Sequence, residues 1–109
     1  MSAIYDIQQP EGILNSSHEA EQFLKQLANK TRLQVLCSLI GKELSVSDLL
    51  SGIDVTQPVL SQHLALLREA KMVATRRDGQ VIYYRLTDER VGQTLSLINQ
   101  FFPAQRTAD

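Results

Sequence analysis

Amide and hydroxyl side chains recur at helical spacing along one stretch of the chain, from Thr56 to Ala70. At 100° per residue, Ser61 and Gln62 point away from an apolar stripe on the same helix. An amide presents a donor and an acceptor together, which matches the N6 and N7 edge of adenine in the DNA major groove. The small, uncharged outer face therefore favours a helix that reads DNA bases. An ordinary core helix with a solvated Gln and Ser face is the alternative.

The ends of this stretch carry the residues that begin and dock a helix. The Thr56 hydroxyl suits the N-cap position, where it can accept from a free backbone N–H. Pro58 is tolerated in the first turn, because no intrahelical donor is needed there. The inward stripe that docks on a core consists of Leu60, Leu64, Leu67 and the stem of Lys71.

Two runs rich in β-branched and aromatic residues follow and flank Asp78-Gly79. An Asp-Gly pair is a strong hairpin signal, since both central residues of a type I′ turn need positive φ. Arg76 and Arg77 thus lie just before the tip of a projecting hairpin. Their position favours contacts with DNA phosphates or the minor groove, and a merely soluble hairpin tip is the alternative.

Capping and helix-stop residues predict four more helices. Ser45 followed by Asp48 is a capping-box variant that opens a short helix ending at Gly52. A short turn joins that helix to the base-reading helix, so the pair forms a helix-turn-helix, and the hairpin makes it a winged helix. The predicted fold is mainly α (α+β), with five helices, a two-stranded wing and a dimeric state. The other helices begin after Ser16 or Ser17 and run through Leu27, run from Lys30 with Asn29 as N-cap to about Ile40 before Gly41, and span roughly Asp88 to Phe102.

The chain divides into three segments on this interpretation. Pro10 and Gly12 fall in a stretch without sustained periodicity, so residues 1–15 are expected to form a partly ordered arm. Residues 16–102 are expected to form the winged helix-turn-helix domain for DNA binding and dimerisation. Residues 103–109 are expected to form a C-terminal tail.

Charge is distributed unevenly along the 109 residues, although the formal net charge is only −1. Residues 1–24 contain four acidic side chains and no Lys or Arg. The segment from Arg68 to Arg85 contains five Lys and Arg residues but only two acidic residues. Such asymmetry is a better guide to an anionic partner than the total charge, and it places the basic segment around the hairpin.

Composition also excludes several classes of protein. A single cysteine, Cys37, excludes an intramolecular disulfide and the usual cysteine-rich zinc patterns. No basic start followed by an apolar run resembles a signal peptide, and no apolar stretch approaches a membrane span, so we expect a cytoplasmic protein with no membrane partner. The chain has no Ser, His and Asp grouping, Gly-rich phosphate loop or metal cluster, so we do not expect an enzyme.

The last helix carries more apolar surface than a small core requires. Its first stripe contains Val91, Leu95, Ile98 and Phe102, and a second contains Leu97 and Phe101. A chain of this length has a thin core, so additional burial through oligomerisation is unsurprising. The surplus predicts a dimer interface.

Several motifs together resemble the ArsR/SmtB family of winged-helix regulators, closest to its HlyU/NolR-like branch without metal sites. The resemblance covers about Glu21 to Phe102. The motifs are Leu27-Ala28-Asn29-Lys30-Thr31-Arg32-Leu33, Glu43-Leu44-Ser45-Val46-Ser47-Asp48-Leu49, Leu60-Ser61-Gln62-His63-Leu64, Leu67-Arg68, Asp78-Gly79-Gln80 and Tyr83-Tyr84-Arg85-Leu86.

The resemblance implies a homodimer built from the first and last helices, with two recognition helices in successive major grooves of a pseudo-palindromic promoter. Either repression or displacement of another DNA-bound protein fits these residues, and neither the operator nor an inducer follows from them. The expected contacts with double-stranded DNA are Thr56, Gln57, Ser61, Gln62, His63, Arg68, Arg76, Arg77 and Gln80. The expected dimer-interface residues are Phe23, Leu27, Val91, Leu95, Ile98, Phe101 and Phe102.

His63 has two open interpretations, because its helical angle lies near the buried stripe. It either orders the helix or donates to a DNA phosphate. For metals, the resemblance implies no cofactor. Ser45 and Ser47 stand where members that bind thiophilic metals have cysteines, and no His follows His63 to complete the zinc site of other members.

Cys37 is the remaining candidate for a switch. Redox-responsive relatives pair its equivalent with a second cysteine near the end of the last helix, where this chain has Phe102 or Pro103. Oxidation of the lone thiol stays chemically open if the thiolate is accessible. Because Leu33, Leu36, Cys37 and Ile40 are expected to share one helix face, a buried and inert thiol is the alternative that we favour.

Three functions are thus distinguished by sequence. The first is a sequence-specific DNA-binding regulator, which the basic hairpin and the small polar helix face favour. The second is a thiol redox sensor acting through Cys37. The third is a winged-helix module that binds only protein, against which the basic segment speaks.

Overall fold

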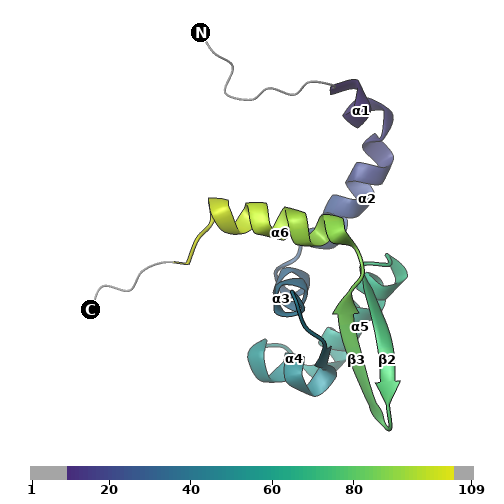
Figure 1. The fold of residues 1–109 in the computed structure, drawn as a ribbon, viewed down its shortest axis with the longest axis vertical. Coiled ribbons are helices and arrows are strands. Elements are labelled where there is room, and N and C mark those ends of the chain that lie inside the picture. Colours follow the sequence, from purple (N-terminus) through teal and green to yellow (C-terminus); the bar gives the residue numbers. More distant parts are fainter. Residues whose placement is uncertain (1–9, 105–109) are drawn as a thin grey trace, which may run out of the picture.

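A computed structural model describes residues 10–104, and this part of the chain folds into six helices and a three-stranded sheet (Figure 1). The predicted winged helix-turn-helix is confirmed. In chain order the elements are α1 (Pro10–Asn15), α2 (Ser17–Leu27), α3 (Lys30–Ser38), β1 (Leu44–Ser45), α4 (Val46–Gly52), α5 (Gln57–Glu69), β2 (Val73–Asp78), β3 (Val81–Leu86) and α6 (Glu89–Phe101).

Helix α1 is one more helix than the sequence predicted, and it falls within the segment expected to be an arm. Pro10 is its first residue, where the fixed φ of proline suits a helix and its missing N–H costs nothing. The Ser17 hydroxyl donates to the carbonyls of Ile13 and Leu14 at 2.9 and 3.0 Å, which joins α1 to α2. None of the six residues of α1 is buried. The rest of the predicted arm, residues 1–9, lies outside the described residues, as does most of the predicted tail, residues 105–109.

The wing contains a third strand that the sequence did not predict. Strand β1 pairs antiparallel with β3, with Leu44 opposite Tyr84 and Ser45 opposite Tyr83, so the sheet order is β1-β3-β2. A strand of two residues is too short to show an alternating pattern. This pairing fixes the start of α4 to the middle of β3.

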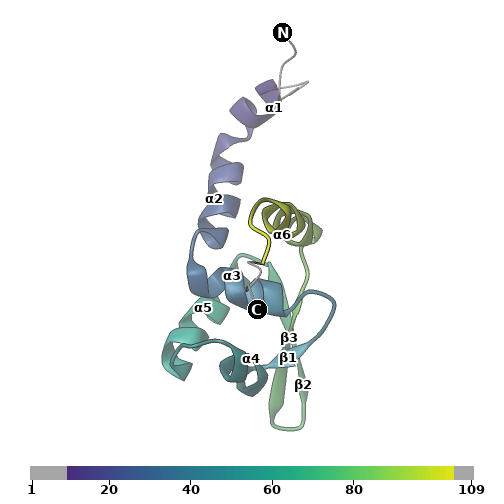
Figure 2. The same cartoon turned by 90° about the vertical axis from the view of Figure 1, so that its left-hand side faces the viewer.

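The hairpin forms as predicted, but its turn is displaced by one residue. Asp78 pairs with Val81, so Gly79 and Gln80 are the two central residues. Gly79 has φ of +65°. Gln80, the second central residue, is not among the residues with positive φ. Positive φ at the first central residue alone fits a type II′ turn, so the predicted type I′ turn is wrong. Figures 1 and 2 show this tip at the end of the molecule opposite to α1.

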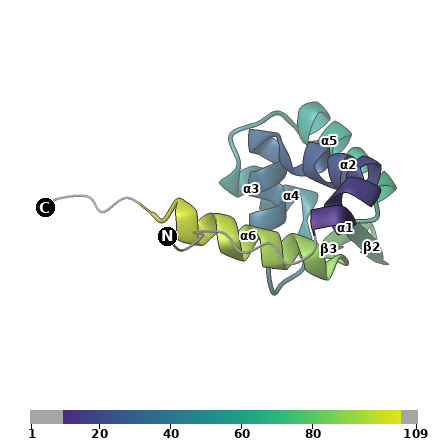
Figure 3. The same cartoon turned by 90° about the horizontal axis from the view of Figure 1, so that it is seen from above.

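The core lies between α3, α4, α5 and the base of the sheet, and the end of α2 and the start of α6 contribute to it. Helix α6 projects from this body, as seen from above in Figure 3. The radius of gyration is 16.6 Å, against about 13 Å for a compact chain of 100 residues. The buried apolar residues are Leu27, Val35, Leu36, Leu39, Leu49, Ile53, Leu60, Leu64, Leu67, Met72, Val73, Val91 and Leu95.

Helix α3 turns a different face to the core than its sequence suggested. Val35, Leu36 and Leu39 are buried, whereas Cys37 and Ile40 are exposed. The helix ends at Ser38, so Ile40 lies in the following turn and does not continue the helical period. The predicted shared face of Leu36, Cys37 and Ile40 is therefore wrong.

Candidate nucleic-acid interface

Helix α4 is fixed at its start by the predicted capping box. The Ser45 hydroxyl accepts from the Asp48 backbone N–H at 3.1 Å, and the Asp48 carboxylate accepts from the Ser45 N–H at 2.9 Å. The bond from the Ser45 backbone is the main reason that the pKa of Asp48 lies below its usual value. Because Ser45 also belongs to β1, the same residue sets the position of α4 against the wing.

Helix α5 separates its apolar and polar sides as the sequence predicted. Leu60, Leu64 and Leu67 are at most 1% exposed, whereas Ser61 and Gln62 are exposed. Gln57, Pro58 and Ala65 are exposed as well. A base-reading helix requires this arrangement, because the side chains that meet DNA cannot also be needed by the core.

Thr56 takes the predicted N-cap position, but its hydroxyl makes no capping bond. Its backbone carbonyl accepts from the Leu60 N–H at 2.9 Å, as the first bond of the helix. The predicted role of the hydroxyl is therefore wrong. The side chain is exposed at the positive end of the helix dipole, where an anionic group is favoured.

The C-terminal end of α5 is closed by a Schellman motif. The Met72 N–H donates to the Leu67 carbonyl and the Lys71 N–H donates to the Arg68 carbonyl, both at 3.0 Å. Lys71 has φ of +62° in the left-handed region. The stem of Lys71 therefore does not extend the leucine stripe as predicted, because the helix has already ended and the side chain is exposed.

His63 is tied to the body of the protein by Arg32. An Arg32 Nη lies 3.3 Å from His63 Nδ1, and Arg32 also donates to the backbone carbonyls of Gln26 and Lys25 at 2.7 and 2.9 Å. Arginine only donates, so Nδ1 accepts and the proton of the neutral ring lies on Nε2. Burial and the charge of Arg32 lower the pKa of His63, which favours this neutral ring. The contact orders α5, and a phosphate contact through Nε2 stays a prediction.

The two arginines near the wing tip differ in their surroundings. Arg76 Nε donates to Glu43 at 2.7 Å, and its guanidinium lies 4.7 Å from the centre of the Tyr83 ring. The bond to Glu43 also raises the pKa of Arg76. Arg77 is exposed, and no ion pair to it occurs within residues 10–104. Arg77 pairs with Ile82 on the sheet face opposite to Arg76, because side chains alternate along a strand.

The face of the hairpin that bears Arg77 is the one covered by the helices. Tyr84 and Leu86, which pack against the core, share it with Arg77 by the same alternation. Arg77 thus extends beyond the core on the side of α4 and α5. Arg68 in the last turn of α5 and Gln80 in the hairpin turn are also exposed.

The chain is similar in sequence to a family of known proteins. Residues 29–75 match the family described as bacterial regulatory protein, arsR family. The transcriptional activator HlyU of Vibrio cholerae is 40% identical over 87 residues, which cover 80% of this chain and 81% of HlyU. The chain belongs to the arsR family. It is a DNA-binding transcriptional regulator and not an enzyme.

Two solved structures extend the likeness over most of this arsR-family chain. The transcriptional repressor BigR of Xylella fastidiosa has a TM-score of 0.82 at 38% identity, covering 87% of this chain and 97% of BigR. NolR of Sinorhizobium fredii has a TM-score of 0.77 at 34% identity, covering 96% and 100%. Relatives thus include proteins named as activators and as repressors.

The residues predicted for a dimer interface divide into two groups. Leu27, Val91 and Leu95 are at most 5% exposed in the single chain, so they belong to its own core. Phe101 and Phe102 are 65% and 76% exposed at the far end of α6. Phe23 is half-buried beneath the Arg90 guanidinium, and Ile98 is half-buried. Exposed Leu24 and Leu97 were not in the predicted set, although Leu97 was in the second stripe of the last helix.

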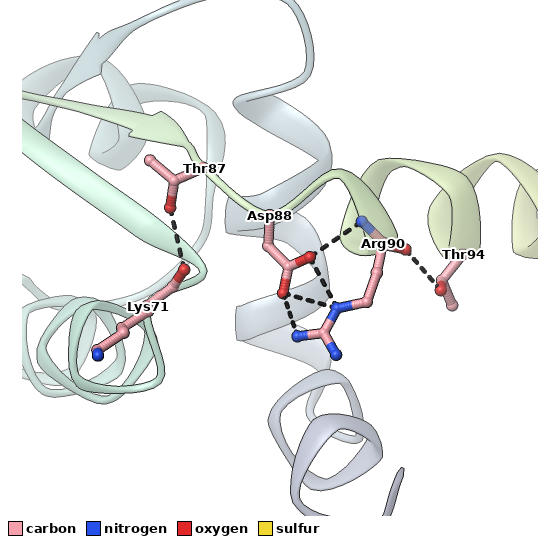
Figure 4. A network of polar contacts seen from close by, with 5 residues as sticks. All are labelled: Lys71, Thr87, Asp88, Arg90 and Thr94. Atoms are coloured by element: carbon pink, nitrogen blue, oxygen red, sulfur yellow. Dashed lines mark hydrogen bonds and ion pairs between the residues drawn. The ribbon is translucent and has the colours of Figure 1, made fainter. Parts of the chain in front are cut away.

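Asp88 anchors the start of α6, as Figure 4 shows. It accepts from the Arg90 backbone N–H at 3.0 Å and pairs with the Arg90 guanidinium at 2.7 Å. The Arg90 side chain is the main cause of the lowered pKa of Asp88. Thr87 donates to the Lys71 carbonyl at 3.0 Å, so the start of α6 is also joined to the end of α5.

Cys37, the single cysteine of the chain, lies on α3. Cys37 is exposed, so the interpretation of a buried thiol is wrong for this chain. Partial burial nevertheless raises the pKa of the thiol, which disfavours the reactive thiolate. Within residues 10–104, no group of three His, Cys, Asp or Glu residues could hold a metal ion. Among the helices of this part, none is both long and apolar enough to cross a membrane.

Proposed function

We propose that this protein is a homodimeric repressor that binds a pseudo-palindromic promoter site through α5 and the wing. The observation that carries the proposal is the exposed face of Ser61 and Gln62 on a helix whose inward stripe of Leu60, Leu64 and Leu67 is fully buried. Arg77 is exposed near the tip of the wing, on the sheet face that it shares with Tyr84 and Leu86. Amide and hydroxyl groups would read base edges, and arginine would neutralise phosphates.

Dimerisation is supported by apolar surface that the single chain leaves in solvent. Four side chains are between 48% and 76% exposed: Leu24 on α2, Leu97 and Phe101 on α6, and Phe102 directly after α6. Two chains joined through these helices would carry two copies of α5. The half-sites of helix-turn-helix dimers lie about one turn of DNA, roughly 34 Å, apart.

Repression follows from occupancy, since a dimer spanning two major grooves would exclude polymerase from promoter sequence. The relatives include BigR, named a repressor, and HlyU, named an activator. Transcription of the bound promoter by purified polymerase distinguishes the two. Added protein should lower transcript yield from the bare template. A rise that occurs only when another DNA-bound protein is present would favour anti-repression instead.

The DNA face is tested by a gel-shift titration over several salt concentrations, using duplexes selected from a random pool. Arg77→Ala should weaken binding to all sequences similarly and should reduce the salt slope by about one. Gln62→Ala should lose about 1–3 kcal/mol of discrimination at one base position. Gln93→Ala, an exposed amide change on α6, is the matched control and should change neither property. Unchanged binding in both test variants, or no salt-sensitive shift by the natural protein, contradicts the proposal.

A further inference from the structure

Arg32, near the start of α3, connects three helices that meet in Figure 2. Its backbone N–H donates to the Asn29 side chain at 3.0 Å, which places the residue in the first turn of α3. Its guanidinium donates to the Gln26 carbonyl at 2.7 Å and to the Lys25 carbonyl at 2.9 Å, both in the last turn of α2. Its remaining nitrogen lies 3.3 Å from His63 Nδ1 on α5.

The contacts with α2 hold the Arg32 guanidinium in a fixed orientation. The last four carbonyls of a helix have no partner within it, and the negative end of the helix dipole lies among them. Arg32 supplies donors to two of these carbonyls of α2 and brings a positive charge to them. The guanidinium is planar, so two bonds to backbone atoms also set the direction of its third nitrogen. Arg32 thus points one N–H at α5 before any ligand binds.

The imidazole of His63 receives this N–H on one side and leaves its other nitrogen accessible. Arginine has no acceptor, so Nδ1 accepts and the proton of the neutral ring lies on Nε2. Nε2 makes no hydrogen bond within residues 10–104 and is not one of the buried unpaired atoms there, so solvent reaches it. The half-buried ring follows exposed Gln62, at the border between the outer face of α5 and the body of the protein. An N–H donor at this border suits a phosphate beside the groove that the helix enters.

We propose that Arg32 is a positioning residue for DNA binding, because it fixes the His63 ring so that Nε2–H donates to a backbone phosphate. This inference rests on the proposed use of α5 as the recognition helix. Arg32 acts from behind the ring, since each of its three side-chain nitrogens is bonded within the chain. A phosphate contact carries no base information, so it strengthens binding to every sequence alike. Arg32 also joins α2, a helix of the proposed dimer, to the helix that would read DNA.

The fixed ring can be detected without DNA. The chain has two histidines, and His18 is exposed on α2. Long-range proton–nitrogen NMR spectra, recorded where both rings are neutral, show which ring nitrogen carries the proton. His63 should be in the Nε2–H form alone, whereas His18 should show the tautomer mixture of a free imidazole. A His63 ring with the same mixture as His18, or with its proton on Nδ1, overturns the inference.

Isosteric substitutions separate the roles of the two nitrogens in a gel-shift titration. His63→Asn keeps an acceptor where Nδ1 lies but loses the outer N–H, so it should weaken binding about tenfold on all duplexes. His63→Gln keeps an N–H near the position of Nε2 and should bind DNA more tightly than His63→Asn. His18→Asn is the matched control on α2 and should have no effect. Unchanged affinity in His63→Asn overturns the inference but not the proposed DNA face, which the Gln62 and Arg77 variants test.

A double-mutant cycle shows whether Arg32 acts through the ring. Arg32→Lys keeps the charge near the end of α2 but loses the planar fork, so it should weaken DNA binding about fivefold. In a His63→Ala background the same change should have little further effect, because the donor that Arg32 positions is absent. An equal loss in both backgrounds would mean that Arg32 only supports the fold, and would overturn the inference. The tautomer of the natural protein decides independently, even where a variant fails to fold.

Discussion

Helices α5 and α6 have the same length, 13 residues, but they complete their packing to different extents. In α5 the stripe of Leu60, Leu64 and Leu67 is entirely buried, and Ser61 and Gln62 lie on the outer side. Val59 and Leu66 of the same helix are 40% and 43% exposed. In α6 the first two turns bury Val91 and Leu95, whereas Leu97 and Phe101 near the other end are 48% and 65% exposed. The single chain thus buries the main apolar stripe of α5 completely, but it buries that of α6 only near its start.

This difference indicates the chemistry of what each helix meets. Ser61 and Gln62 of α5 lose water at low cost only to a partner that returns hydrogen bonds, which DNA bases and phosphates do. The outer end of α6 gains from any partner that removes apolar surface from water, at roughly 25 cal/mol per Å². A second copy of α6 is such a partner. Under the proposed function, α5 would recognise DNA and the outer end of α6 would associate two chains.

The largest expected effect tests the claim that the leucine stripe of α5 is fully buried within the single chain. Leu64→Ala should lower the free energy of unfolding by about 3 kcal/mol, because it removes a fully buried side chain and leaves a cavity. Urea denaturation followed by circular dichroism measures this loss at low and high protein concentration. The loss should be the same at both, since Leu64 contacts only its own chain.

Leu97→Ala on α6 is the matched control for that measurement. Leu97 is half-exposed, so the change should cost little when the protein is dilute. The cost should grow with concentration if the side chain is buried by association. A large and concentration-independent loss for Leu97→Ala would remove the contrast between the helices.

Local chemistry explains what the sequence could predict. The leucine stripe of α5 and the Ser45 and Asp48 capping box depend on residues three or four positions apart. The Asn29 cap accepts from the Arg32 N–H at 3.0 Å, also three positions away. The helix-turn-helix and hairpin follow from such short-range signals. The candidate DNA contacts were predicted from the same spacing and are still to be tested.

Other features depend on contacts or geometry that spacing does not reveal. Glu43 and Arg76 are 33 positions apart, and only the pairing of β1 with β3 brings them together. The gap between Arg32 and His63 is 31 positions. Lys71 looked like a member of the leucine stripe, because a helical period does not show where the helix stops. Cys37 is exposed for a different reason: it lies within α3, but the helix turns Val35, Leu36 and Leu39 to the core instead.

The second effect tests the claim that the exposed apolar end of α6 is buried by a second chain. Phe101→Glu should weaken the proposed dimer by about 2 kcal/mol or more, because it replaces an exposed aromatic anchor by a charge. Sedimentation velocity over a concentration series measures the change. Asn99→Glu adds the same charge to the same helix at an exposed polar position and should have a smaller effect. A natural protein that sediments as a monomer at all concentrations would contradict the dimer.

The smallest effect concerns the backbone conformation of Lys71, which ends α5. Lys71 has φ of +62°, and within residues 10–104 it is the only residue other than glycine with positive φ. This left-handed conformation strains a residue that carries a side chain. Lys71→Gly should therefore raise the free energy of unfolding by about 1 kcal/mol, since glycine adopts this φ freely. Ala70→Gly is the control, because Ala70 has φ of −75° and should lose about 0.5–1 kcal/mol instead. Thermal denaturation compares the two, and a loss of stability in Lys71→Gly would mean that the Lys71 side chain stabilises the end of α5 in a way its exposed position does not indicate.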